Sequence, residues 1–382
     1  MLSFQKAQRF FCLVLTVAVC AIASLALPMR LLGDDLSEAQ LTQSAQTFFD
    51  AYGRAIRKAA DVSAFLDLLT DQIELTYAGK PGQVIPFAGT FIGHPGVESA
   101  LKFLRRSSST DSFAVEEILP TSFAVDFSKG FTPDKFLIPQ HNRVSSILEE
   151  RRTVLDTKRH YRLDVICLLT VEGNGKISNI HFFYDSYVPS EAYIGDHDQI
   201  VNPDIDPILN PTRDRSADPT ATLLSVLNFF FTFANPDVSV NGNFEPLRAV
   251  ITPDCVVSFA GDPKYLPFAD KVIRQGADEV LRTFAQQLQN SRPRNFNIQE
   301  FFVAHDRVIT NTLEDRTSTA SNRGYEVNVE ILMTVKEGRV GSIQGIFDST
   351  ITTTAFTGVD PFLSILKHKS NSAQHSDKDQ DD

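Results

Sequence analysis

The stretch TYAGKP at residues 76–81 recurs in the same chain as SFAGDP at residues 258–263. After a short gap each copy reaches a second shared motif, IPFA at 85–88 and LPFA at 266–269. Later matches pair LEER, 148–151, with LEDR, 313–316, and IHFFYDS, 180–186, with IQGIFDS, 343–349. The shared order and nearly equal spacing over about 130 residues predict two homologous domains.

Both copies have the same predicted layout. Each opens with an amphipathic helix, whose apolar residues in the first copy recur at helical spacing between residues 41 and 56. The elements expected next are a short helix at 62–69, a strand at 73–77 or 256–259, a helix after a glycine at 96–104 or 276–288, and long strands such as 161–171 and 177–187. Helices followed by a run of antiparallel strands predict α+β domains.

The two ends and the spacer have distinct compositions. Lys6 and Arg9 precede an apolar run at residues 10–27, which predicts export through a cleaved signal peptide or an uncleaved membrane anchor. We therefore expect a secreted, periplasmic or membrane-anchored protein that meets the membrane only through 10–27. The predicted division is 1–27 signal or anchor, 36–194 domain 1, 195–218 Pro/Asp-rich linker, 219–357 domain 2 and 367–382 disordered tail.

Composition limits the partners. The 382 residues include 47 acidic and 36 basic side chains, a net charge of −11, which argues against a nucleic-acid binder. There are 30 Phe and no Trp, so many Phe must be buried as core or cavity lining. Copy one carries an insert between Leu119 and Asn142 that either caps a pocket as an apolar lid or extends a sheet edge. Its phenylalanines are Phe123, Phe127, Phe131 and Phe136.

The element order, a G-x-x-G helix start and the strand endings GKISNIHFFYDS, 175–186, and GRVGSIQGIFDS, 338–349, resemble a known family. They are similar to the SnoaL-like branch of the nuclear-transport-factor-two-like superfamily. The resemblance implies two tandem cone-shaped half-barrels, each a curved, mostly antiparallel sheet wrapped around helices, with an apolar pocket at one end. Such domains commonly pair sheet to sheet, so a tandem chain could form an internal pseudo-dimer.

The resemblance also suggests catalytic residues. Enzymes of this superfamily use an Asp or His inside the cone as general base, and an apolar cavity shifts the pKa of such a group towards the working pH. Asp185 and Asp348 occupy the last-strand position where SnoaL-like cyclases carry their Asp, while His181 and Tyr77 are polar candidates of copy one. The alternative is that each Asp ends its strand or caps neighbouring backbone, identically in both copies.

The candidate catalytic residues are therefore Asp185, His181 and Tyr77. The candidate ligand-binding residues are Phe87, Phe183, Tyr161, Phe259, Phe268, Tyr325 and Asp348. No metal-ligand spacing and no cofactor motif occurs in the sequence. Glu150/Arg151 and Asp315/Arg316 lie in predicted strands, where consecutive residues point to opposite faces, so we expect these residues to form exposed ion pairs with neighbouring strands.

Three functions remain open at this stage. The favoured one is a non-catalytic module that holds a small apolar molecule in one or both Phe-lined cones. The second is a cofactor-free enzyme of the cyclase, isomerase or dehydratase type, with Asp185 as base in domain 1. The third is a protein-association module whose cones are filled by their own side chains, so a cavity facing Asp185 and His181 distinguishes the first two functions from the third.

Overall fold

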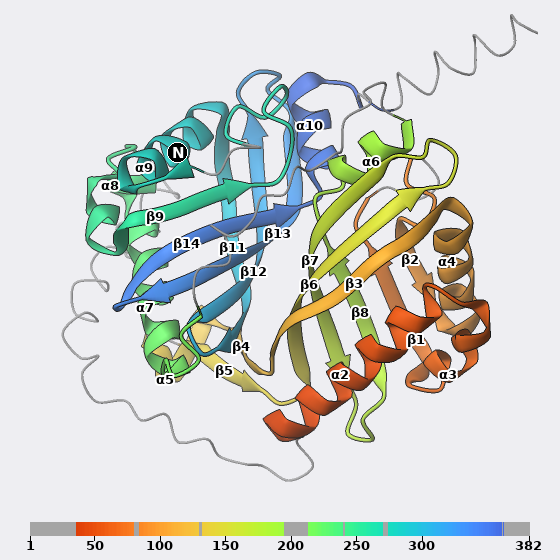
Figure 1. Ribbon diagram of the computed structural model, residues 1–382. Helices are drawn as coiled ribbons and strands as arrows, with labels where there is room; N and C mark the ends of the chain where they lie inside the picture. The colour runs from red at the N-terminus through yellow and green to blue at the C-terminus, as the bar shows by residue number, and fades with distance from the viewer. Residues whose placement is uncertain are drawn as a thin grey trace, which may run out of the picture.

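The computed structural model describes residues 36–79, 84–129, 132–194, 213–239, 241–269, 274–360 and 362. The predicted export segment and tail, and most of the linker, lie outside the described residues. Two α+β domains are present, each with a curved sheet and helices on one of its faces (Figure 1). Among the described residues, no helix is both long and apolar enough to span a membrane.

Domain 1 begins with the long helix predicted from its apolar spacing. Its helices are α2 (Glu38–Ala55), α3 (Val62–Leu66), α4 (Gly93–Ser107) and α6 (Tyr187–Ile194), with a 3-10 turn at Ala59–Asp61. A capping box between Ser37 and Gln40 satisfies the first free N–H groups of α2. The apolar side of α2 is buried through Phe48, Phe49 and Tyr52, so this helix fills the concave face of the sheet.

The sheet of domain 1 has six strands. They are β1 (Leu69–Tyr77), β2 (Gly89–Ile92), β3 (Ser108–Leu119), β6 (Arg143–Val154), β7 (His160–Val171) and β8 (Ile177–Phe183), in the order β2-β1-β8-β7-β6-β3. All neighbours are antiparallel except β1 and β8, which run parallel. The last strand ends at Phe183, earlier than predicted, because the chain turns into α6 from Tyr187.

Domain 2 repeats this arrangement, including the parallel pairing of its first and last strands. Its elements are α7 (Pro219–Ala234), α8 (Pro236–Ser239), a 3-10 turn at Glu245–Ala249, β9 (Ile251–Phe259), β10 (Arg274–Gln275), α9 (Ala277–Asn290), β11 (Ser291–Ala304), β12 (Arg307–Ser318), β13 (Gly324–Lys336), β14 (Arg339–Phe347) and α10 (Ser349–Thr357). The equivalent helices α7 and α9 pack on the core of this second sheet.

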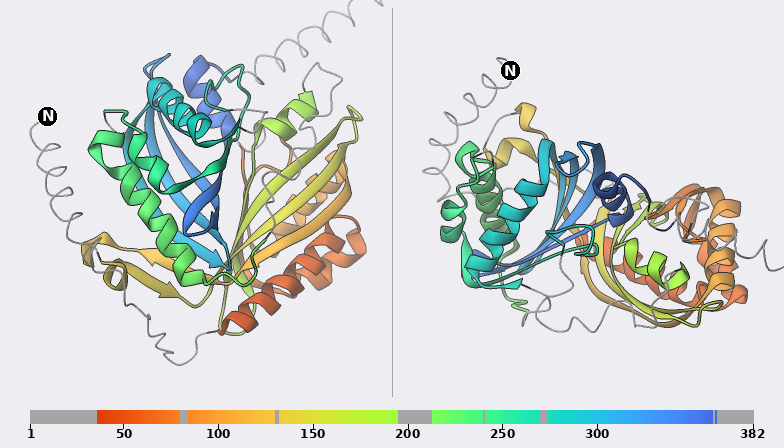
Figure 2. Two further views of the ribbon diagram at one scale, coloured as in Figure 1. Left: turned by 60° about the vertical axis from the view of Figure 1, so that its left-hand side comes forward. Right: turned by 90° about the horizontal axis from the view of Figure 1, so that it is seen from above.

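The insert of copy one belongs structurally to domain 2. Its elements are β4 (Thr121–Val125), a 3-10 turn at Phe127–Lys129, α5 (Pro133–Phe136) and β5 (Leu137–Gln140). Strand β4 pairs antiparallel with β11, which gives an eight-stranded sheet in the order β10-β9-β14-β13-β12-β11-β4-β5 (Figure 2).

The phenylalanines of the insert follow the hairpin into domain 2. Phe136 is fully buried there, and Phe123 and Phe127 pack beside it; Phe131 lies outside the described residues. The expected lid over the domain 1 pocket is therefore wrong, and the alternative of an extended sheet edge holds, although the edge is that of the other domain.

The two sheets face each other across the middle of the molecule, with helices α2, α4, α7 and α9 on the outer sides (Figures 1 and 2). Apolar side chains from both sheets form a shared cluster there, consisting of Leu119, Ile147, Ile166, Leu168, Phe183, Phe302, Ala304, Ile309, Leu332 and Ile346. Two ion pairs cross beside it: Arg143 with Glu300 at 2.9 Å, and Arg307 with Glu117 at 3.1 Å. Apolar burial and paired charges thus hold the domains together.

Candidate functional site

The cone of domain 1 is occupied by aromatic side chains. The rings of Tyr52 and Tyr77 both stack on Phe182, with centroids 5.1 and 5.0 Å away. The two hydroxyl groups are 2.9 Å apart and hydrogen-bonded. Burial raises the pKa of both phenols above the usual 10, so both stay neutral. Tyr77, a predicted catalytic residue, is thus part of a packed interior, as are the predicted ligand-binding residues Phe87 and Tyr161.

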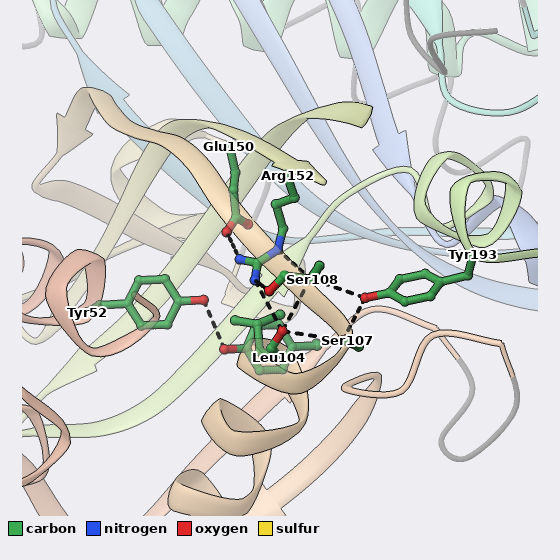
Figure 3. A network of polar contacts seen from close by, with 8 residues as sticks. Tyr52, Leu104, Ser107, Ser108, Glu150, Arg152 and Tyr193 are labelled. Carbon is green, nitrogen blue, oxygen red and sulfur yellow. Dashed lines mark hydrogen bonds and ion pairs between the residues drawn. The ribbon is translucent and has the colours of Figure 1, made fainter. Parts of the chain in front are cut away.

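A buried charged group that the sequence analysis missed lies in this cone (Figure 3). The side chain of Arg152 is fully buried, and its Nη1 donates to Glu150 at 2.5 Å. Its Nε donates to the Ser108 hydroxyl at 2.9 Å, and its Nη2 donates to the carbonyls of Leu104 and Ser108. Every guanidinium nitrogen therefore has an acceptor, and Arg152 ties β6 to the end of α4 and the start of β3.

The charge state of Arg152 follows from its neighbours. Burial lowers the pKa of this guanidinium, but the charge and hydrogen bond of Glu150, together with the nearby phenols of Tyr161 and Tyr52, raise it by more in sum, and the net pKa is above the usual value. The expectation of an exposed cross-strand ion pair is wrong for Glu150, because its partner is the fully buried Arg152 of the same strand. Alternation along β6 puts Glu150 and Arg152 on the concave face, whereas Arg151 points to the other face and pairs with Glu149 at 2.9 Å.

Domain 2 contains the same arrangement around Arg316. Its Nη1 donates to Glu314 at 2.9 Å, and its Nε donates to the Ser291 hydroxyl at 2.8 Å. The expected exposed cross-strand ion pair is present for Asp315, which pairs with Arg294 across β11 and β12, but the expectation is wrong for Arg316, which is buried. The structural equivalent of Arg316 is Arg152, one residue later than the motif alignment indicated, and the shared Glu-x-Arg spacing is the signal that could have revealed it. Recurrence in both domains indicates a structural role.

Asp185, the predicted base, lies at the contact between the domains. Its Oδ2 accepts the backbone N–H of Gly261 of domain 2 at 2.7 Å. Its Oδ1 accepts the N–H of Tyr187 at 3.0 Å and the hydroxyl of Ser349. Burial raises the pKa of Asp185, and these hydrogen bonds oppose that shift. Its acceptor positions are thus occupied by backbone and hydroxyl groups.

Asp348 makes the reciprocal contact. Its Oδ2 accepts the N–H of Gly79 of domain 1 at 3.1 Å. Its Oδ1 accepts the Ser186 hydroxyl and caps α10 through the N–H of Thr350 at 3.1 Å. Gly79 and Gly261 both have positive φ angles, 106° and 112°, so glycine suits the two positions where the backbone turns towards an Asp. The capping alternative for the two aspartates is the one that the structure bears out.

Comparison with known proteins finds a family match for part of the chain. The model of the SnoaL-like domain matches residues 232–343. This segment of the chain is a SnoaL-like domain. The resemblance expected from the motifs is confirmed there, and the internal repeat relates domain 1 to the same SnoaL-like unit. A search of curated proteins finds no match.

Solved structures with similar folds have SnoaL-like or related descriptions. An NTF2-like protein from Burkholderia xenovorans LB400 is 22% identical, with 41% of this chain and 98% of that chain covered and a TM-score of 0.30. An NTF2-like protein of unknown function from Burkholderia pseudomallei K96243 is 14% identical, with 36% and 98% covered and a TM-score of 0.31.

A cavity of about 470 Å³ lies between the SnoaL-like domain and its repeat, and we call it the interdomain groove. Its lining residues come from β1, β2 and β8 of domain 1 and from β12, β13 and α10 of domain 2. Four predicted site residues meet in its lining: Tyr77, His181, Phe183 and Asp348. The other predicted residues are not part of it: Asp185, Phe87, Tyr161, Phe259, Phe268 and Tyr325. The last three of these are buried in the core of domain 2.

His181 is one of the polar residues that line the interdomain groove. The imidazole stacks on Phe183, with ring centroids 3.7 Å apart. Burial, together with the positive charge of Arg143, lowers the pKa of His181 to about 4. The ring is therefore neutral at physiological pH and can donate one hydrogen bond and accept another. Among the described residues, no group of His, Cys, Asp or Glu has the arrangement of a metal site.

Proposed function

We propose that the chain is a non-catalytic binding protein that holds a small, largely apolar molecule in the interdomain groove. The observation that carries the proposal is that both domains supply the walls of a 470 Å³ cavity that includes His181 and Phe183. Pockets for small molecules typically have volumes of about 300–1,000 Å³ and combine apolar walls with a few polar groups. The ligand site is thus moved from the cones, where we first expected it, to the space between the domains.

The lining suggests what kind of molecule fits. Phe183, Leu313 and Ile351 offer apolar surface, while neutral His181 and the amide of Asn328 offer hydrogen bonds without a positive charge. Glu326 and Asp348 add carboxylates at the wall, which disfavour an anionic ligand. A neutral molecule with an aromatic or aliphatic body and one or two polar atoms satisfies these conditions.

The hydrogen bonds of Asp185 argue against the enzyme alternative. A general base needs a lone pair directed at the substrate, whereas the oxygens of Asp185 accept from Gly261, Tyr187 and Ser349. We propose that Asp185 and Asp348 join the two domains as a pseudo-dimer. The aromatic filling of the domain 1 cone favours association as a second candidate function, in which the interdomain groove has no ligand.

A fluorescence titration distinguishes these functions. N-phenyl-1-naphthylamine is a neutral apolar probe, and we expect its fluorescence to rise on binding to the full chain. Asn328→Trp, an exposed position in the groove wall, should weaken that binding at least tenfold, since an indole occupies the cavity. Asn295→Trp is the matched control, because Asn295 is also exposed on a strand of domain 2 and does not line the groove. Equal binding by the two variants would rule out the interdomain groove as the site.

Export is a separate part of the proposal. The charged residues Lys6 and Arg9 before the apolar run 10–27 support it. Expression in the source cell followed by fractionation should give an extracytoplasmic protein. N-terminal sequencing would then show either a start just after Ala26, as for a cleaved signal, or an intact anchor. A full-length chain in the cytoplasm would contradict export.

A further inference from the structure

A second cavity, of about 740 Å³, lies at one end of the domain 2 sheet, and we call it the acidic groove. The turns β11–β12 and β13–β14 meet the first half of α7 there. Its described lining residues are Asp214, Ala217, Asp218, Ala221, Thr222, Ser225, Thr252, Asp254, Val256, Gln275, Asp306, Thr334, Val335, Lys336, Glu337, Gly338 and Gly341. It shares no lining residue with the interdomain groove, so the two cavities are independent sites.

The charge of the acidic groove is one-sided. The described lining includes five carboxylates and a single basic side chain, Lys336, whose ammonium lies 3.5 Å from Asp254. The N-terminus of α7 lies at this groove, and its helix dipole is equivalent to about half a positive charge, which by itself would attract an anion. Asp218 caps that terminus by accepting the N–H of Thr220 at 3.0 Å. The other four carboxylates add more negative charge than the helix dipole supplies positive charge. The site therefore attracts cations.

Asp306 distinguishes this cavity from a mere acidic surface. Its side chain is almost wholly buried, with 5% of the residue exposed, and it lines the groove. Its Oδ2 accepts the N–H of Asp214 at 3.0 Å, whereas Oδ1 is buried and has no hydrogen-bond partner among the described residues. A buried carboxylate oxygen without a donor is costly, and a donor supplied by a ligand removes the cost.

Domain 1 has no carboxylate at the position equivalent to Asp306. The backbone carbonyl of Asp306 accepts the N–H of Val335 at 2.8 Å, and the equivalent carbonyl of domain 1 is that of Asn142, which accepts from Val171. The repeat thus has an exposed neutral amide where domain 2 has a buried acid. The backbone of this turn needs no acidic side chain, so a structural requirement of the turn does not explain Asp306.

We propose that the acidic groove binds a small organic cation whose ammonium group donates to Asp306. The volume is far larger than a bare metal ion needs, and the described residues do not form a metal cluster there. The hydroxyl groups of Thr252 and Ser225 and the open backbone at Gly338 provide further polar contacts. An aliphatic amine with two or three ammonium groups suits a cavity of this volume that is lined by five carboxylates.

Isothermal titration of the full chain with spermidine in 150 mM salt tests the proposal. We expect one saturable site, and Asp306→Asn should weaken it about tenfold or more, because one charge-assisted hydrogen bond is lost. Asp50→Asn on the exposed side of α2 removes the same charge far from the groove and should bind as the wild type does. Equal affinity of the two variants would overturn the proposal, because it would mean diffuse attraction to a chain of net charge −11.

Two further measurements keep the test decisive. Ala221→Lys places a competing ammonium on the exposed wall of the groove without touching Asp306, and it should also weaken spermidine binding. The matched control is Gln43→Lys on exposed α2, which should have no effect. Displacement of spermidine by an equimolar amount of magnesium chloride would contradict a site for an organic cation.

Discussion

Replacing Glu330 by isoleucine should stabilise the protein, because this carboxyl group is buried between the two sheets. Glu330 is fully buried in β13, and neither of its carboxyl oxygens has a hydrogen-bond partner among the described residues. Burial and the negative charge of Glu300 raise its pKa well above 4.5, and the positive charge of Arg143 only partly opposes the shift. The equivalent residue of domain 1 is Ile166, which belongs to the apolar cluster between the sheets.

The sign of the pH dependence follows from this raised pKa. Below pH 4.5 the side chain is protonated in both the folded and unfolded chains, so its contribution is constant. Above pH 4.5 the folded chain holds a proton that the unfolded chain has lost. The free energy of unfolding then falls by about 1.4 kcal/mol per pH unit until the pH reaches the pKa of the folded state. At pH 7 the substitution should stabilise the protein by about 1 to 4 kcal/mol.

Urea unfolding of the wild type, Glu330→Ile and Glu330→Gln between pH 5 and 8 measures these effects. The difference in free energy of unfolding between Glu330→Ile and the wild type should grow with pH. Glu330→Gln should likewise lack the fall in stability with pH that Glu330 causes in the wild type. Glu326→Gln is the control, since Glu326 lies on the same strand but is exposed, and it should parallel the wild type. A Glu330→Ile variant that is less stable than wild type at pH 7, or a gap independent of pH, would refute the reasoning.

Three further outcomes are expected. Arg152→Met should lower the free energy of unfolding by about 3 to 5 kcal/mol, because Glu150 is left without its partner, whereas Arg151→Met should change it by less than about 0.5 kcal/mol; urea unfolding compares the two. Phe136→Ala should lower the free energy of unfolding by about 3 to 5 kcal/mol, because this ring is fully buried in the domain 2 core, whereas Lys135→Ala should change it little. An unchanged stability of Phe136→Ala would contradict the packing of the insert against domain 2. The NMR signal of His181 should move only as the pH approaches about 4, and stability should fall as the pH drops from 6.5 towards 4, since the unfolded chain binds the proton first.

The repeat made the fold predictable, because each motif was present twice and the element order could be checked against itself. The helix at α2 followed from apolar spacing, and the roles of Asp185 and Asp348 as caps were among the alternatives. Strand alternation explains why His181 and Phe183 share one face of β8 and both line the interdomain groove.

The remaining features depend on information that local patterns do not contain. The hairpin of β4 and β5 has ordinary strand alternation, which does not reveal the sheet edge that it joins, and it crosses to β11 of domain 2. The buried Arg152 was missed because an alignment shifted by one residue exchanges the two faces of a strand. Glu330 breaks the apolar pattern of the interface, so only the packed sheets could show that it is buried.

A crystal structure of the full chain with N-phenyl-1-naphthylamine would test the central claim most directly. We predict that the aromatic rings of the probe lie in the interdomain groove against His181 and Phe183, with walls from both domains. Probe density inside the domain 1 cone, with the rings of Tyr52 and Tyr77 pushed apart, would contradict the account and restore the cone as the ligand site.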